Sequence, residues 1–130
     1  MRYLMHRLSW LGVLVLLAQA GCGKKLNDDR IVQVEPAEER LIIADPASRD
    51  QSVTVTWNAD GTPIDIYLFL EKDQKAASQA ITLGKTSGLL GSQSKTDKGM
   101  LEVQVASREK LVVMLTSSKP ASVRLHIAGK

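Results

Sequence analysis

Short apolar runs with a period of two recur along the chain from about residue 30 onward, and this pattern restricts the fold more than any other feature. In residues 52–57, two valines and Trp57 alternate with serine and threonine, and residues 100–106 and 121–128 alternate in the same way. Successive side chains of a strand point to opposite faces, so each run predicts a β-strand with one buried and one solvated face. We expect Trp57 on the buried face.

Two further runs are apolar on both faces. Residues 64–70 carry aliphatic side chains on one side and Tyr67 and Phe69 on the other, while residues 111–115 contain no polar residue. Strands of this kind are typical of the centre of a sheet. Weaker strand candidates at residues 31–34, 41–44 and 80–83 raise the expected total to seven or eight.

The connections between these runs are short and rich in turn-forming residues. The segment 58–63 contains Asn, Asp, Gly and Pro and predicts a hairpin turn between two strong strands. Connections of this length cannot hold crossover helices, so we expect an all-β, antiparallel β-sandwich of the immunoglobulin-like or jelly-roll-like kind. Residues 72–79 are expected to form a turn or two of helix, and residues 84–99 a long flexible loop.

The N-terminus has the layout of a targeting segment. A basic start is followed by an apolar run of about a dozen residues and by small residues before Cys22. Such a run is too short for a permanent membrane span, which needs about 20 residues. We therefore expect residues 1–21 to be a signal peptide, residues 22–29 an N-terminus that carries the anchor and a short tether, and residues 30–130 one β-sandwich domain.

Residues 16–22, with the sequence LLAQAGC, resemble a bacterial lipobox, in which the cysteine becomes the acylated N-terminus. The resemblance implies a lipid on Cys22 and anchoring to a membrane of the cell envelope. Because Gly23 rather than Asp follows the cysteine, it also implies the outer membrane in a Gram-negative cell. The rival interpretation is cleavage after Ala20, which would leave a soluble periplasmic or secreted protein.

The cysteine count favours lipidation. Cys22 is the chain's single cysteine, so an exported form has no internal disulfide partner. Acylation uses this otherwise oxidisable thiol, and an intermolecular disulfide is the third possibility.

Charge and side-chain chemistry argue against several functions. Removal of Arg2 and Arg7 would leave 15 Lys and Arg against 14 Asp and Glu, which is not the clustered basic surface that nucleic acid requires. His126 has no second His or Cys to complete a zinc site. Fragments of a calcium loop at residues 58–61 and of a phosphate loop at 84–86 lack the rest of their motifs. We expect no metal, no cofactor and no enzymatic activity.

The strand pattern also resembles a known family. Residues 53–57 and 64–68, followed by 110–115 and 123–127, are similar to bacterial pre-peptidase C-terminal domains and, more loosely, to fibronectin-like and immunoglobulin-like modules. The resemblance implies a non-catalytic accessory or adhesion role. The sequence leaves open whether the domain binds an envelope protein or a polysaccharide, or is an assembly subunit of an envelope complex.

The apolar second face of residues 64–70 has two interpretations. Either the segment 72–90 folds back over Tyr67 and Phe69, with Leu89 and Leu90 covering the rings, or the rings stay exposed beside Met114 as a partner-binding patch. Exposed aromatic side chains would make such a patch a candidate binding surface.

Overall fold

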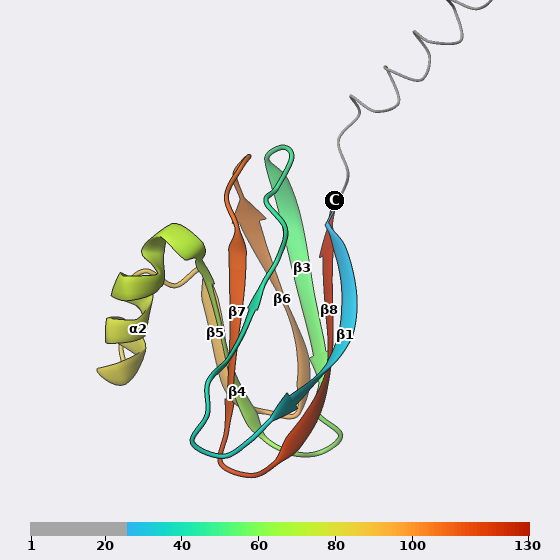
Figure 1. Ribbon diagram of the computed structural model, residues 1–130, viewed down its shortest axis with the longest axis vertical. Helices are drawn as coiled ribbons and strands as arrows, with labels where there is room; N and C mark the ends of the chain where they lie inside the picture. Colours follow the sequence, from blue (N-terminus) through green and yellow to red (C-terminus); the bar gives the residue numbers. More distant parts are fainter. Residues whose placement is uncertain (1–25) are drawn as a thin grey trace, which may run out of the picture.

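The computed structural model describes residues 26–130, which form two layers of β-sheet with one helix packed outside them (Figure 1). The predicted signal peptide and Cys22 lie outside the described residues. The strands are β1 Asn27–Val34, β2 Arg40–Ile43, β3 Gln51–Asn58, β4 Ile64–Leu70, β5 Gly91–Thr96, β6 Lys98–Val105, β7 Leu111–Ser117 and β8 Ala121–Gly129, and the helices are the 3-10 turn η1 Glu71–Asp73 and α2 Gln74–Thr82.

The strands pair in a nested order. Sheet A has the order β1-β8-β3-β6 and sheet B the order β2-β7-β4-β5, and every pair is antiparallel. The first strand therefore pairs with the last, the second with the seventh, the third with the sixth and the fourth with the fifth. A long antiparallel hairpin wrapped into two layers gives this order, which is that of a jelly roll. The predicted antiparallel β-sandwich is confirmed, in its jelly-roll form.

The two runs that are apolar on both faces occupy the centre of sheet B. β4 lies between β7 and β5, and β7 lies between β2 and β4. Their inner faces meet sheet A, and their outer faces lie beneath α2. The expectation that both strands are central is confirmed because only central strands with covered faces bury aliphatic side chains on both sides.

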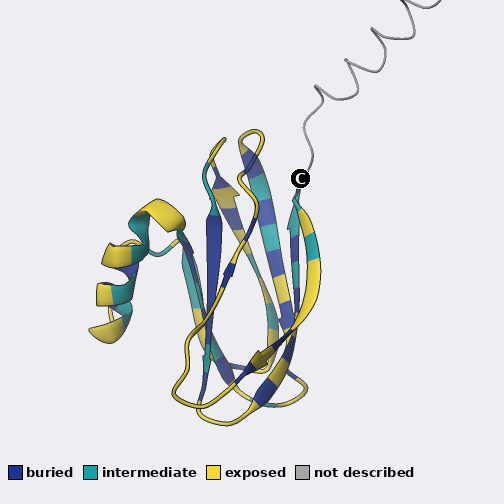
Figure 2. Ribbon diagram, viewed as in Figure 1, coloured by how far each residue is buried: buried dark blue, intermediate teal, exposed yellow. Residues whose placement is uncertain are grey.

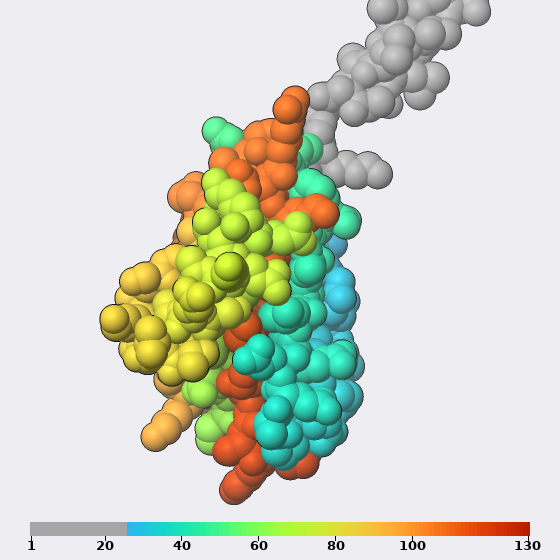
Figure 3. All heavy atoms as spheres, turned by 60° about the vertical axis from the view of Figure 1, so that its left-hand side comes forward, coloured from blue at the N-terminus to red at the C-terminus, as the bar shows by residue number. Residues whose placement is uncertain are grey.

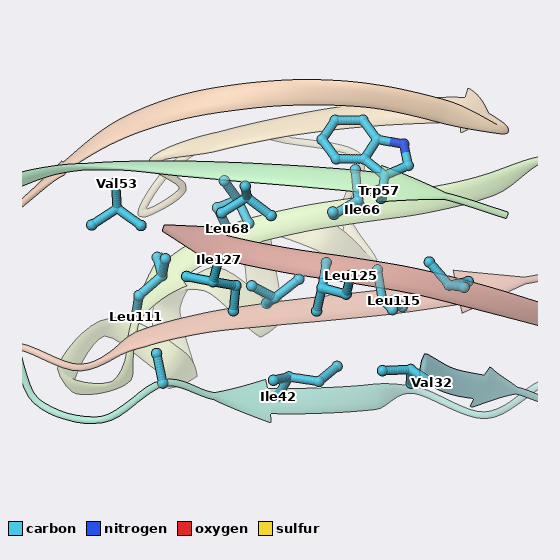
Figure 4. Packing of buried hydrophobic residues seen from close by; sticks show 14 of the residues in the cluster. Val32, Ile42, Val53, Trp57, Ile66, Leu68, Leu111, Leu115, Leu125 and Ile127 are labelled. Atoms are coloured by element: carbon cyan, nitrogen blue, oxygen red, sulfur yellow. The ribbon is translucent and has the colours of Figure 1, made fainter. Parts of the chain in front are cut away.

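The core lies between the two sheets and is mostly aliphatic (Figure 4). Trp57 is its largest side chain and is 1% exposed, as expected from its place in β3. Its indole Nε1 donates a hydrogen bond to Thr96 Oγ1 at 3.3 Å, so the one polar atom of the ring is satisfied. Figure 2 shows the alternation of buried and exposed residues along β3 that the sequence predicts.

Four local expectations differ from the structure. β1 begins at Asn27, so residues 27–29 of the predicted tether belong to the domain. Residues 80–82 end α2 rather than forming a strand, because Ala77 and Ala80 are buried with helical spacing. The predicted loop 84–99 contains β5 and the start of β6. The turn at 58–63 is not a hairpin, since β3 and β4 lie in different sheets.

One end of the sandwich holds both termini of the described chain. We call it the Leu26 end; it comprises Leu26, the β2–β3 loop at residues 44–50, the β6–β7 loop at 106–110, and Lys130 (Figure 1). The opposite end, the far end, consists of the turns at 35–39, 59–63 and 118–120. Within residues 26–130, no helix has the length and apolar character needed to span a bilayer.

Candidate functional site

The outer face of sheet B carries apolar side chains in register across three strands. Two rows cross β4, β7 and β2 in that order: Tyr67, Met114 and Leu41, and Phe69, Val112 and Ile43. Cross-strand neighbours of this kind pack against one another and form a continuous apolar surface. A surface of this size in water needs a cover or a partner.

Helix α2 covers the β4 and β7 part of this surface. Ala77 faces the sheet and is fully buried, and Ile81 and Leu89 pack against the same cluster. Phe69 and Met114 are 0% and 2% exposed as a result. The covering role expected for residues 72–90 is therefore confirmed.

The cover by α2 argues against the second interpretation of the sequence, in which Tyr67 and Phe69 stay exposed beside Met114 as a partner-binding patch. Phe69 and Met114 cannot contact a partner while α2 is in place, because their side chains are enclosed between the helix and the sheet. Leu89 supplies part of the cover, whereas Leu90 remains 40% exposed and supplies little. Of the predicted contact residues, Tyr67 alone keeps an accessible part, and burial followed by the nearby charge of Asp65 raises the pKa of its hydroxyl.

The β2 part of the surface is not covered. Leu41 and Ile43 are 41% and 45% exposed on the edge of sheet B. In Figure 3 the helix and the segment after it stand forward on one part of this side of the molecule, and the β2 region lies beside them. β2 pairs with β7 only, so its second edge has no strand neighbour among the described residues.

A cleft of about 570 Å³ opens where β1 and β2 are both edge strands. Its apolar wall comes from Leu26, from the adjacent Ile43 and Ala44, and from Ile127, which belong to three separate segments of the chain. Volumes of this order are typical of sites for small molecules or for short stretches of a polymer. The cleft is therefore the candidate binding site of the domain.

Charged groups line one side of the cleft. The Arg30 guanidinium pairs with the Asp28 carboxylate through two hydrogen bonds, one of them from Nε to Oδ1 at 3.1 Å. The hydrogen bond to Asp28, together with the negative charges of Asp28 and Asp45, keeps the pKa of Arg30 above its ordinary value. The pair is largely in water, so it contributes little to stability. The pair therefore presents a positive guanidinium and a negative carboxylate to a ligand, beside the apolar wall of the cleft.

A smaller, polar pocket of about 240 Å³ lies on the outer face of sheet A, toward the far end. Its lining includes Ile31, Asn58, Asp60 and Arg124. Ile31 is 62% exposed and is the apolar contact that this pocket offers. The pocket is a second, less enclosed place for a polar partner.

The residues with recognisable chemistry are not assembled into a site. His126 faces outward from β8 opposite Asp29 and Thr56. Between Leu26 and Lys130, no three His, Cys, Asp or Glu side chains lie together in a way that could hold a metal ion.

The fragment that resembles a calcium loop is a turn. Asn58 Oδ1 accepts a hydrogen bond from the Asp60 amide at 3.0 Å, and Asp60 and Gly61 both have positive φ. An asparagine side chain that caps its own turn in this way accounts for these residue types without a ligand.

Solved structures share the fold, and two of them illustrate the resemblance. The pre-peptidase C-terminal domain of collagenase from Bacillus anthracis overlaps with a TM-score of 0.56 at 7% identity, over 78% of this chain and 89% of that domain. The Yersinia pseudotuberculosis-derived mitogen overlaps with a TM-score of 0.53 at 11% identity, over 78% of this chain and 84% of that protein. No protein family and no curated protein matches the sequence. The fold resemblance to pre-peptidase C-terminal domains that the sequence suggested is thus supported.

The cleft could not be found from the sequence. Leu26 and Ile127 are about a hundred positions apart, and they meet because β1 pairs with β8. No motif marks either residue. Only the charged triplet in residues 28–30, unusual for a strand, distinguishes this segment in the sequence.

Proposed function

We propose that this protein is a membrane-anchored bacterial lipoprotein whose jelly-roll domain is a non-catalytic binding or structural module of the cell envelope. Its lipid is carried by Cys22 in this proposal. The alternative is a soluble periplasmic or secreted protein cleaved after Ala20. Neither outcome changes the fold of residues 26–130.

One observation carries the proposal. Leu26, only four positions after the predicted acylation site, is already fixed in the domain: its amide donates to Gln51 Oε1 at 3.4 Å, and its carbonyl accepts from the Gly129 amide at 2.7 Å. An anchor at Cys22 would therefore hold one defined end of the sandwich near the bilayer. The far end and the outer face of sheet A would then point away from the bilayer, and the cleft, which Leu26 and the β2–β3 loop help to line, would lie beside the anchored end.

The anchor is tested by substitution of the cysteine. We expect Cys22→Ala to abolish acyl labelling and to leave the protein unprocessed or released from the membrane fraction. The matched control is Ser118→Ala, an exposed position at the far end, which should leave labelling and fractionation unchanged. A Cys22→Ala protein that is processed and fractionates like the unchanged protein would rule out the anchor.

The binding role is tested at the cleft. A photo-crosslinking amino acid is placed at Ile43 in the cleft, at Ile31 in the pocket of sheet A, or at Lys75 on the solvent side of α2. We expect crosslinks to an envelope protein or to a polysaccharide from Ile43 and not from Lys75. Crosslinks from Ile31 alone would move the binding site to sheet A, and equal background from all three positions would contradict a binding role.

A further inference from the structure

Four strands lie at the edges of the two sheets, and three of them carry features that discourage pairing with another chain. β1 has charged side chains at residues 28–30. β5 is polar and is interrupted by a register shift beside a residue with positive φ. β6 has an exposed lysine and an exposed glutamate on either side of Met100. β2 is the exception, because both side chains on its outer face, Leu41 and Ile43, are apolar and exposed.

The backbone of β2 offers free hydrogen-bonding groups beside these two side chains. The Ala44 amide donates to the Leu111 carbonyl at 2.9 Å. In the β2–β7 register, alternate residues from Ala44 back to Arg40 therefore bond to β7. The N–H and C=O groups of Leu41 and Ile43 point the other way, toward the edge that has no strand neighbour among the described residues. A second extended chain would satisfy these groups and continue the sheet.

The space beside this edge is open. The cleft of about 570 Å³ lies where the edges of β1 and β2 face each other, and Ile43 is part of its lining. Ile42 points into the core instead (Figure 4). A strand laid along β2 would turn one row of side chains toward the cleft and place the other row beside Leu41 and Ile43. Such a strand would be the partner in the proposed function, on which this step rests.

Exposed carboxylates lie at both ends of the β2 edge. Glu39 precedes the strand and Asp45 follows it, and neither forms an ion pair among residues 26–130. Arg40 is the single base in residues 35–45, against four carboxylates. Arg30, the base that lines the cleft, is already paired with an aspartate of its own strand. An added strand is therefore complementary in charge when its basic side chains lie opposite Glu39 and Asp45.

A second copy of this chain fits the edge poorly. In one register, two antiparallel β2 strands place Leu41 opposite Ile43. Glu39 then lies opposite Asp45, so like charges face each other at both ends. A shift of the register by two residues puts a carboxylate opposite Leu41 or Ile43 instead. The edge therefore favours a strand from a different chain.

We infer that β2 binds an extended segment of an envelope protein as an added antiparallel strand, and that this segment carries two alternating apolar residues with a basic residue two positions beyond each. Its apolar side chains pack beside Leu41 and Ile43. Its basic side chains pair with Glu39 and Asp45. In this mode of recognition the backbone hydrogen bonds supply affinity and alternate side chains supply specificity. A polysaccharide does not present N–H and C=O groups with the spacing of a strand, so the edge favours a protein partner.

The test uses a probe peptide with the sequence TKTVTVTKT and the mature protein isolated from its host. The valines and lysines of the probe share one face of an extended strand, and the threonines form the other. A second peptide, TETVTVTET, has glutamates in place of the lysines. Binding is measured by fluorescence anisotropy of a dye attached to each peptide.

We expect the lysine peptide to bind and the glutamate peptide to bind about tenfold or more weakly, because two attractive charge pairs become repulsive. N-methylation of the two valines removes the donors that face β2 and should weaken binding by about tenfold or more. The same modification of two threonines, whose amides point away from β2, is the matched control and should leave binding unchanged.

Two variants of the protein test the edge itself. Leu41→Lys places a charge on the open edge and should weaken binding by about tenfold or more, whereas Met100→Lys, the same change at an exposed residue of another edge strand, should not. Thermal unfolding should be similar for both, because both side chains are exposed. Glu39→Lys combined with Asp45→Lys should reverse the preference, so that the glutamate peptide binds more tightly.

The possible results separate the added strand from the proposed function. Failure of the lysine peptide to bind, equal binding of the two peptides, or a loss that does not single out the valine amides overturns the added strand. Dimers of this chain that Leu41→Lys dissociates would overturn it in favour of a second copy. Crosslinks from Ile43 to a polysaccharide alone would overturn it while the binding role of the cleft stands. Equal background from all crosslinking positions would contradict the binding role itself.

Discussion

At the level of single residues, the indole of Trp57 packs directly over Gly99 in the core. Gly99 is opposite Trp57 in the β3–β6 register, and a Cβ on Gly99 would lie 2.7 Å from the indole Cζ2. We expect Trp57→Ala to lower the free energy of unfolding by about 3 to 5 kcal/mol because it leaves a large cavity. We expect Gly99→Ala to lower it by about 1 to 3 kcal/mol through overpacking. Denaturant unfolding measures both.

The cause of the Gly99 effect can be isolated with a double substitution. If the added methyl group clashes with the indole, Gly99→Ala should cost much less in a Trp57→Phe background, where the outer ring atoms are missing. Equal costs in both backgrounds would show that the glycine is needed for another reason. Native fluorescence typical of a solvated indole would contradict the burial of Trp57.

Tyr67 provides a prediction about pH. Burial and the charge of Asp65 raise the pKa of its hydroxyl above 10.0, so the folded state favours the protonated ring. This contribution to stability is complete below pH about 10 and is lost as the pH rises through the folded-state pKa. We expect Asp65→Asn to bring the pKa partly back in an absorbance titration, and Tyr67→Phe to reduce the fall in stability at alkaline pH. An unchanged pKa in Asp65→Asn would exclude the charge as a cause.

Helix α2 is the element that makes the outer face of sheet B stable in water. Ala77 is fully buried against the cluster of Phe69 and Met114, whereas the neighbouring Ala76 is exposed. We expect Ala77→Asp to lower the free energy of unfolding by about 2 kcal/mol or more, because it would bury an unpaired charge. Ala76→Asp, in the same turn of the helix, should change it by less than about 0.5 kcal/mol. Similar costs at both positions would mean that the helix does not pack on the sheet as described.

The elements differ in how far the sequence predicts them. Strands with a buried face, such as β3 and β8, could be predicted because alternating burial requires alternating residues. β5, with the sequence GSQSKT, could not, because an edge strand with mostly exposed side chains carries no apolar alternation. The apolar run at residues 80–83 does not distinguish a helix from a strand, because a short buried helix and a short buried strand contain similar residues.

At the scale of the whole molecule, the pairing order was the part that sequence patterns could not provide. Turn residues at 58–63 and 117–120 predict a reversal of the chain but not whether the next strand stays in the same sheet. In the structure both segments connect one sheet to the other. The cleft depends on this order, because Leu26 and Ile127 are brought together by the pairing of β1 with β8. Its lining therefore became visible only with the fold.

The anchor can be tested most directly by mass spectrometry of the N-terminal peptide of the protein isolated from the membranes of its host. The account predicts a mature chain that starts at Cys22 and carries a lipid on that residue. A chain that starts at Gly21 with an unmodified thiol on Cys22 would contradict it and would show that the protein is released by cleavage after Ala20.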